Sequence, residues 1–148
     1  MKIGVISDTH GVVNPGVFQV FQGVDVILHA GDIGSEDVIS ELQSIAPVHA
    51  VKGNCDFMTG RMYPVEKRLE LRGKMILMRH IPLRDPGNMK DIDIFVHGHT
   101  HDARNEMIGG LLVFNPGYAG PAKGDVEISV GLIELGSTNV RAWIERLR

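Results

Sequence analysis

The fold is decided at the start of the chain, by the stretch KIGVISDTH at residues 2–10. Its apolar, β-branched part is typical of a strand that is buried on both faces of a parallel sheet, and an acid and a histidine follow at once. The pattern returns twice, because VDVILHA at 24–30 runs into Gly-Asp and VHAV at 48–51 runs into KGNCD. Three short buried strands, each followed by polar residues, are therefore predicted.

Helices are predicted between these strands. Asn14-Pro15 opens a segment whose apolar residues at 17, 18, 20 and 21 have helical spacing. Ser35 is a favourable N-cap for a second helix, which Pro47 ends. The order strand, helix, strand, helix, strand predicts an α/β fold. Since the carboxyl ends of parallel strands lie at one edge of a sheet, the polar residues that follow them should converge there.

The second half of the chain is predicted to consist mostly of strands. The expected strands are 66–71, 74–80, 92–96, 107–108, 111–115, 127–134 and 139–144. Turns at Arg72-Gly73 and Gly109-Gly110 separate the members of two hairpins. Prolines and a glycine crowd the segment 81–91, so at most a single helical turn is expected before residue 92.

Composition predicts one domain, 1–148, without a membrane segment. The chain has 148 residues, a net charge of −3, 43% hydrophobic residues and one cysteine. We find neither an apolar run that could span a bilayer nor a signal peptide, so a cytoplasmic protein is expected. A basic stripe with interleaved aromatics is also missing, which gives no strong indication of nucleic-acid binding. The alternation at 141–144 indicates an exposed edge or an interface, so a homo-oligomer is one expectation.

The polar residues that follow the strands form a set of oxygen and nitrogen donors. In chain order they are Asp8, His10, Asp32, Asn54, His80, His99 and His101. Such donors suit Mn²⁺, Fe²⁺, Zn²⁺ or Ni²⁺ better than Ca²⁺, which prefers oxygen alone. Seven donors are too many for one tetrahedral ion but sufficient for two ions that share a bridging carboxylate.

The spacing of these residues has a physical reading. If strand geometry continues through Asp8-Thr9-His10, the side chains of Asp8 and His10 point the same way, and residues 99 and 101 repeat that spacing. The glycines before Asp32 and Asn54 permit a sharp turn and a close approach of the backbone.

These motifs carry a family resemblance. The blocks, in order, are Asp8-Thr9-His10, Gly31-Asp32, Gly53-Asn54-Cys55-Asp56, His80, Gly98-His99-Thr100-His101 and Asn115-Pro116-Gly117. They resemble the calcineurin-like metallophosphoesterase superfamily, in its branch of small prokaryotic phosphodiesterases. The resemblance implies a four-layer α/β/β/α sandwich and two divalent metal ions, with Mn²⁺ the first choice. One ion would be held by Asp8, His10, Asp32 and His101, and the other by Asp32, Asn54, His80 and His99. Asp32 would then be the bridge, and we assign Asp32, Asn54 and His99 to catalysis.

The expected activity is hydrolysis of a small phosphorylated substrate, a phosphodiester before a monoester. Two ions supply +4, two carboxylates and a bridging hydroxide subtract three, and roughly +1 is left to attract the anionic phosphate. The hydroxide would attack phosphorus in line with the leaving group.

Two residues depart from the superfamily pattern. Cys55 stands where many members have a histidine that protonates the leaving group, and a neutral thiol is a poorer acid. We expect substrates with good leaving groups, or another acid. Ile81 follows His80 where glycine is usual, which affects the substrate pocket more than the metal ions. Cys55 itself is expected to be a small buried side chain.

Two alternative functions remain open, and the three other histidines are expected to lie outside the site. A nuclease of the same superfamily is one alternative. The second is a non-catalytic scaffold for protein–protein interaction, as in the retromer sorting subunit, which is similar in fold. The remaining histidines, His29, His49 and His97, are expected to be bystanders with packing or surface roles, and His97 should face away from His99.

Overall fold

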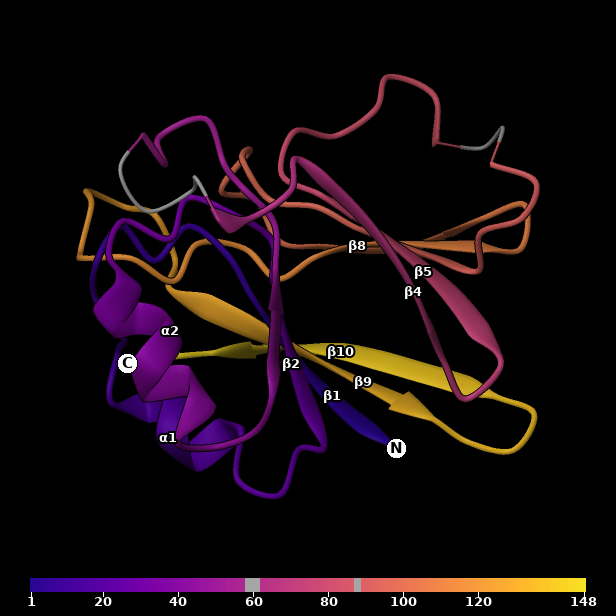
Figure 1. Ribbon diagram of the computed structural model, residues 1–148, viewed down its shortest axis with the longest axis horizontal. Helices are drawn as coiled ribbons and strands as arrows, with labels where there is room; N and C mark the ends of the chain where they lie inside the picture. The colour runs from indigo at the N-terminus through magenta and orange to yellow at the C-terminus, as the bar shows by residue number, and fades with distance from the viewer. Residues whose placement is uncertain (58–61, 87–88) are drawn as a thin grey trace.

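Two five-stranded sheets pack face to face in the computed structural model, which describes residues 1–57, 62–86 and 89–148 (Figure 1). The elements are β1 Lys2–Ile6, α1 Gly16–Val20, β2 Val26–His29, α2 Glu36–Gln43, β3 Val48–Ala50, β4 Glu66–Leu71, β5 Lys74–Arg79, β6 Ile94–Val96, β7 Arg104–Ile108, β8 Leu111–Asn115, β9 Ser129–Leu135 and β10 Val140–Arg146. Every predicted strand and helix is present, with ends that shift by a few residues. The largest shift is that β7 begins at Arg104.

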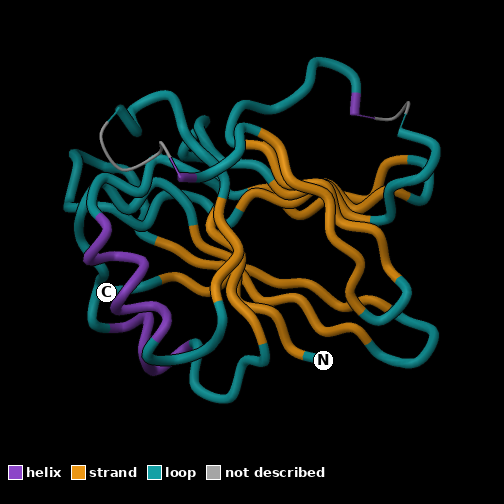
Figure 2. The backbone as a smooth tube through the Cα atoms, viewed as in Figure 1, coloured by secondary structure: helices purple, strands orange, loops and turns teal. Residues whose placement is uncertain are grey.

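The first sheet has the order β10-β9-β1-β2-β3. Its strands β1, β2 and β3 are parallel, as predicted, while β9 pairs antiparallel with β1. Both helices lie against its outer face (Figure 2), where Val17, Phe21 and Leu42 pack on Ile6 and Ile27. Strands with both faces covered are mostly apolar, which is why β2 reads VILH and is wholly buried, and its one polar residue, His29, has hydrogen-bond partners.

The predicted start of α2 is confirmed in detail. The Ser35 side chain accepts a hydrogen bond from the Asp37 backbone N–H, and two acids occupy the first turn. The helix ends at Gln43, before Pro47. Among the described residues, no helix has the length and apolar character needed to cross a bilayer.

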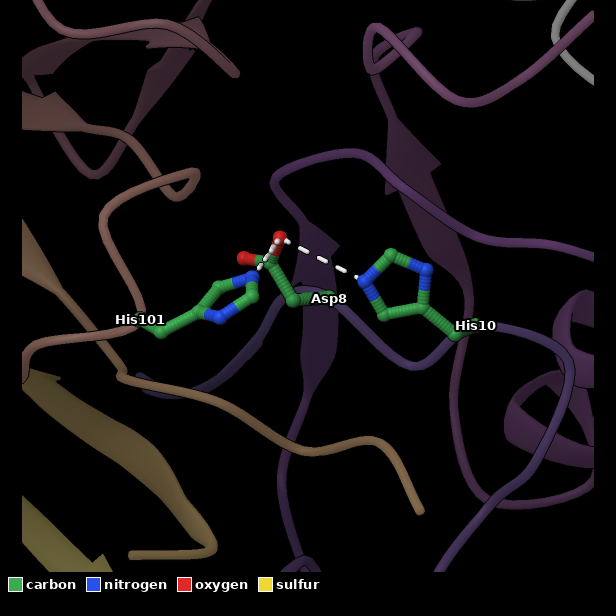
Figure 3. Close-up of side chains that lie close together, drawn as sticks. All are labelled: Asp8, His10 and His101. Carbon is green, nitrogen blue, oxygen red and sulfur yellow. Dashed lines mark ion pairs between the residues drawn. The ribbon is translucent and has the colours of Figure 1, made fainter. Parts of the chain in front are cut away.

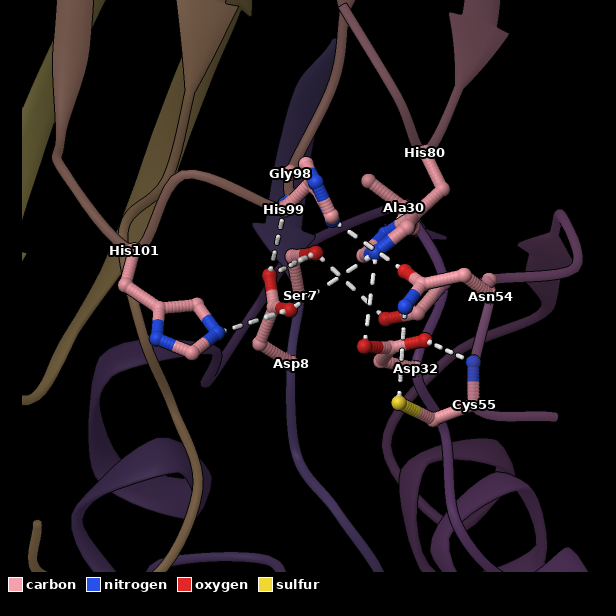
Figure 4. Close-up of polar contacts among 12 residues, drawn as sticks. Ser7, Asp8, Ala30, Asp32, Asn54, Cys55, His80, Gly98, His99 and His101 are labelled. Carbon is pink, nitrogen blue, oxygen red and sulfur yellow. Dashed lines mark hydrogen bonds and ion pairs between the residues drawn. The ribbon is translucent and has the colours of Figure 1, made fainter.

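The second sheet has the order β4-β5-β6-β8-β7, and its central strands β5, β6 and β8 are parallel. It packs on the first sheet through a shared core in which Val5 and Leu28 meet Ile76, Ile94 and Phe114. The carboxyl ends of β1, β2 and β3 therefore face the carboxyl ends of β5 and β6 across the sandwich, which brings the loops after these five strands together (Figure 4).

The predicted α/β sandwich is confirmed, but in place of the helical fourth layer of an α/β/β/α arrangement the described residues form a loop. The outer face of the second sheet carries a small apolar cluster in which Leu77, Phe95 and Val113 contact Ile92 and Leu83. The segment 80–93 supplies this cover, and its described residues contain no α-helix. Prolines at 82 and 86 explain the loop, because proline lacks the N–H that a helix interior needs.

The shared core predicts that truncating the Leu28 side chain strongly destabilises the fold. This side chain is fully buried between the sheets. We expect Leu28→Ala to lower the free energy of unfolding by about 2–5 kcal/mol through lost burial and the cavity left behind. Urea denaturation measures the change. Met107→Ala, at an exposed apolar position on β7, is the control and should stay within about 0.5 kcal/mol. Equal effects of the two variants would contradict this assignment of the core.

Candidate metal centre

A cluster of carboxylates and imidazoles lies where the loops after the parallel strands meet (Figure 4). Asp8 and His10 follow β1, Asp32 follows β2, and His80 follows β5. The loop after β6 adds His101. Strands from both sheets thus deliver the side chains to one place, as the sequence predicts.

Asp8, His10 and His101 form a first group that could hold a cation (Figure 3). Oδ1 of Asp8 lies 3.3 Å from Nε2 of His101 and 3.9 Å from Nε2 of His10. The carboxylate is completely buried, while the two imidazoles are partly exposed. The group therefore has the buried carboxylate on one side and is open to solvent on the side of the two imidazoles.

Asp8, Asp32 and His80 form a second, wholly buried group. Nε2 of His80 lies 3.4 Å from Oδ2 of Asp32 and 3.9 Å from Oδ1 of Asp8. The same Oδ2 atom of Asp32 lies 3.9 Å from Nε2 of His10. Oδ1 of Asp8 therefore faces three imidazoles and Oδ2 of Asp32 faces two, and Asp8 belongs to both groups.

Each carboxylate divides its two oxygens between different partners. Oδ2 of Asp8 accepts hydrogen bonds from the Ser7 hydroxyl (2.7 Å) and the His99 backbone N–H (3.1 Å). Oδ1 of Asp32 accepts from the Cys55 backbone N–H at 2.8 Å. One oxygen of each acid thus holds a neighbouring loop, and the other oxygen faces the imidazoles.

The donors fit a divalent cation. Oδ1 of Asp8 and Nε2 of His80 are buried and have no hydrogen-bond partner within the described part of the chain. Leaving such atoms unpaired is costly, whereas a cation would satisfy both. Nδ1 of His80 donates to the Ala30 carbonyl at 2.7 Å, so a neutral ring directs its lone pair at Nε2 toward the carboxylates. A fixed tautomer of this kind is typical of a metal-ligating histidine.

The pKa values indicate a site that favours positive charge. Burial lowers the pKa of His80, but the facing carboxylates of Asp32 and Asp8 outweigh burial and raise it above its ordinary value. Burial likewise opposes ionisation of Asp32, yet the His80 ring and the Cys55 backbone N–H hold the pKa of this acid well below its usual range. Asp32 is therefore ionised at neutral pH and available as an anionic ligand.

The backbone of these loops differs from the expected strand geometry. The strand geometry on which the expectation for Asp8 and His10 is based does not continue, although the two side chains do meet in one group. The backbone enters the left-handed region at Asp8 (φ 57°), His10 (47°), Asp32 (54°), His99 (72°) and His101 (62°). Such conformations cost roughly 1–3 kcal/mol each and persist where the surroundings enforce them. The side chains converge through tight turns, in which the Asp8 N–H donates to the Gly31 carbonyl at 3.0 Å.

The glycines in the motifs are required by close approach of the loops. A Cβ at Gly31, where φ is +99°, would lie 2.8 Å from the His80 ring. At Gly53 a Cβ would collide with the Asp32 backbone and carboxylate, although φ there is not positive. The predicted sharp turn is therefore confirmed at Gly31, and the predicted close approach at both positions.

Asn54 and His99 lie beside the second group and contact each other. Nδ1 of His99 donates to Oδ1 of Asn54 at 3.1 Å, and the His99 ring meets the His80 ring edge to face, with centroids 5.3 Å apart. Both residues are exposed. The structure thus places them at the mouth of the cluster, outside the two buried or half-buried groups, and their metal-binding and catalytic roles stay predictions.

Sequence reasoning missed the part that His29 plays. The Gly31 N–H donates to Nδ1 of His29 (3.2 Å), so Nε2 carries the proton and donates to the Thr9 hydroxyl at 2.9 Å. Thr9 in turn donates to the Ile33 carbonyl. This buried chain links the loop between Asp8 and His10 to the loop that carries Asp32. The apolar strand around His29 gave no signal, because the partners come from other loops.

The other two bystanders behave as expected. His97 is buried, stacks on Phe95 with ring centroids 5.5 Å apart, and points away from the cluster. His49 lies on β3, where Nδ1 is 2.9 Å from the Lys67 amine. The expected burial of Cys55 is wrong, however, because its side chain is exposed.

The fold and the cluster together define a class, α/β sandwiches with a carboxylate–imidazole centre between two sheets. Comparison with known proteins identifies the family within that class. The chain matches the calcineurin-like phosphoesterase superfamily domain over residues 1–138, and it belongs to this family. A probable metallophosphoesterase of Methanothermobacter thermautotrophicus is 33% identical in an alignment of 131 positions, and the alignment covers 79% of this chain and 76% of that protein.

Two further relatives bear on the alternatives. Phosphodiesterase YfcE of Escherichia coli K12 is 28% identical in an alignment of 161 positions, gaps included, and the alignment covers 90% of this chain and 88% of that protein. The crystal structure of Vps29 from Chaetomium thermophilum superposes with a TM-score of 0.86 at 18% identity, over 100% of this chain and 88% of that one. The second likeness concerns the fold alone.

His29 predicts a distinctive dependence of stability on pH. Burial lowers the pKa of His29 to about 3, from 6.5. Below pH 6.5 the unfolded chain therefore takes up a proton that the folded chain refuses until about pH 3, and stability falls in that window. We expect the metal-free wild type to lose about 2 kcal/mol more than His29→Gln between pH 7 and pH 5. Urea denaturation at the two pH values measures this, and parallel losses would refute it.

Proposed function

We propose that this protein hydrolyses phosphodiesters with the help of two divalent metal ions. The observation that carries the proposal is the pair of buried carboxylates, Asp8 and Asp32, of which one oxygen faces three imidazoles at Asp8 and two at Asp32. Membership in the superfamily supports a phosphoester hydrolase, and the relative named phosphodiesterase supports diesters.

In this proposal the donors divide into two sets. One ion is held by Asp8, His10, Asp32 and His101, and the other by Asp32, Asn54, His80 and His99. Oδ2 of Asp32 lies 3.9 Å from Nε2 of His10 and 3.4 Å from Nε2 of His80, so it can reach both sets. Oδ1 of Asp8 lies 3.9 Å from the same two nitrogens, and the choice of Asp32 as the bridge rests on the family resemblance. Mn²⁺ is the first choice for this mixed oxygen and nitrogen set, with Ni²⁺, Fe²⁺ and Zn²⁺ as alternatives.

When bound, the ions would lower the pKa of water and neutralise charge on the phosphate. The chain's own residues supply orientation. The Ser7 hydroxyl and the His99 backbone N–H hold the Asp8 carboxylate, while the Cys55 backbone N–H holds Asp32. Because strained, hydrogen-bonded loops fix these donors before substrate arrives, little reorganisation is needed in the transition state. Water would then attack phosphorus in line with the leaving oxygen.

In this proposal the leaving group has only a poor proton donor at the position of Cys55. Cys55 occupies the position where the superfamily often has histidine, and its Sγ lies 3.6 Å from Nδ2 of Asn54. Desolvation and the nearby Asp32 carboxylate raise the pKa of the thiol, so it stays protonated but is a poor acid at neutral pH. Diesters with good leaving groups should therefore be the better substrates.

Replacement of Asp32 tests the proposed centre. We expect Asp32→Asn to lose at least one bound metal ion and to lower the rate on bis(4-nitrophenyl) phosphate by about 100-fold or more, because a shared anionic ligand is removed. Elemental analysis and a chromogenic assay with Mn²⁺ measure both effects, and chelator should abolish wild-type turnover. Asp102→Asn, at an exposed acid close to His101 in sequence, is the matched control.

The same assay separates the enzyme from the scaffold that the likeness to Vps29 suggests. Wild-type protein with neither bound metal nor turnover would support the scaffold. Unchanged metal content and rate in Asp32→Asn would refute the proposed centre.

Cys55 predicts how the rate depends on the leaving group. We expect Cys55→His to raise the rate on methyl phenyl phosphate by about 100-fold, the lower end for a positioned acid, and to change the rate on methyl 4-nitrophenyl phosphate little. Initial rates on the two esters, which differ only in the leaving group, measure this. Cys55→Ser is the control and should match the wild type. A selective loss on the phenyl ester in Cys55→Ser would instead identify the thiol as the acid.

A further inference from the structure

A cleft of about 280 Å³ opens directly beside the candidate metal centre. One wall is the loop after β3, from Lys52 to Phe57, and the other is the end of β5, from Arg79 to Ile81, with Val65 between them. Asn54 and His80 belong both to this lining and to the cluster described above. A group attached to a phosphorus atom at the centre would therefore enter the cleft without crossing another element.

The cleft gathers apolar side chains that are otherwise exposed. Phe57, Val65 and Ile81 line it, and they are 81%, 60% and 44% exposed. Large apolar side chains that cluster around a concavity mark a ligand site, whereas isolated ones carry no such meaning. The volume is about twice the ~150 Å³ of a cavity that holds benzene and lies just below the range of drug-sized pockets. The cleft therefore matches a single ring or a nucleobase.

One buried donor in the wall lacks an acceptor. Nε of Arg79 is buried without a hydrogen-bond partner among the residues that the structure describes, although Nη1 lies 3.6 Å from Oε2 of Glu66. The Arg79 side chain as a whole is 34% exposed, so a group bound in the cleft would meet the terminal N–H groups of the guanidinium rather than the enclosed Nε and would gain from an acceptor there. Lys52 lines the same cleft and adds a second cationic side chain, whereas the oxygens of the acid in the lining, Asp56, already accept hydrogen bonds from the Gly34 and Gly53 N–H groups. The occupant should therefore be apolar in its body and carry an acceptor, or an anionic group, at its edge.

We propose that this cleft binds one organic arm of the phosphoester, and that this arm is a ring-sized aromatic group with an acceptor at its edge. The inference rests on the proposed function, because the centre must bind the phosphorus end. It adds the substrate class: aryl or nucleoside phosphoesters are preferred over small alkyl phosphoesters.

Phosphonates with a single carbon arm test this without hydrolysis. Affinities of methylphosphonate, phenylphosphonate and 4-carboxyphenylphosphonate for the Mn²⁺-loaded protein are measured by titration calorimetry. We expect phenylphosphonate to bind about tenfold more tightly than methylphosphonate, because a ring is buried against apolar walls. The carboxylate should add about a further tenfold through Arg79.

Two variants test which side chains produce these gains in affinity. Val65→Asp places a charge in the apolar wall and should bring the phenyl-to-methyl affinity ratio close to one. Met107→Asp makes the same change at a position of similar exposure, 64%, on β7 and should keep the wild-type ratio. Arg79→Lys keeps the charge but removes the planar, forked guanidinium donors, so it should reduce the gain from the carboxylate and leave the phenyl-to-methyl ratio unchanged.

The outcomes separate this inference from the proposed function. Equal binding of methylphosphonate and phenylphosphonate would overturn the inference and leave the function standing, and it would mean that the apolar wall serves another partner, such as a protein. Tight phenyl binding without a gain from the carboxylate would overturn the assignment to Arg79. Binding of neither phosphonate would overturn the proposed function and this inference with it.

Discussion

Two buried carboxylates are the constraint on which the rest of the site depends. Asp8 is entirely buried and Asp32 nearly so, and each uses one oxygen to hold a loop and keeps the other toward imidazoles. Burying two negative charges close together is expensive unless positive charge or hydrogen bonds compensate. The raised pKa of His80 is one sign of that demand. The left-handed backbone at Asp8 and Asp32 adds a further cost, so packing of the two sheets must stabilise a centre that would not form in isolated loops.

The sequence was sufficient for the fold and for the five residues that meet in the two groups, but not for their local geometry. Apolar runs such as VDVILHA before Gly31-Asp32 locate a buried strand and its functional end, because both depend on residues that are neighbours along the chain. The hydrogen bonds of His29 depend on Thr9 and Gly31, which approach only in the folded state. For the same reason, the left-handed turn at His10 and the exposure of Cys55 could not be predicted from the sequence. Spacing two residues apart suggested a continued strand, whereas the backbone turns.

The likeness in fold and the proposed function depend on different parts of the structure. The likeness to Vps29 at 18% identity concerns the sandwich, which depends on apolar patterning and tolerates many sequences. The proposed function depends instead on a few atoms, the oxygens of Asp8 and Asp32 and the ring nitrogens that face them. Cys55 and the apolar cleft beside Asn54 lie next to those atoms and, in the proposal, decide which ester is suitable. A shared sandwich therefore does not by itself assign a function, which has to be argued from the side chains that the loops of this chain bring together.

The position of β1 has a consequence for how the centre is assembled. This strand lies between β2 and β9, so the residues that lead to Asp8 are fixed on one side by a partner from the opposite end of the chain. Closing so long a loop is entropically slow, and folds dominated by such distant pairings form more slowly than those built from local contacts. Asp8 and Asp32 themselves follow strands that pair directly, so their approach needs only the shorter loop between β1 and β2 to close. His80 and His101 come from the second sheet and reach the same place only when the two sheets pack, so the full set of donors is expected to be complete late in folding.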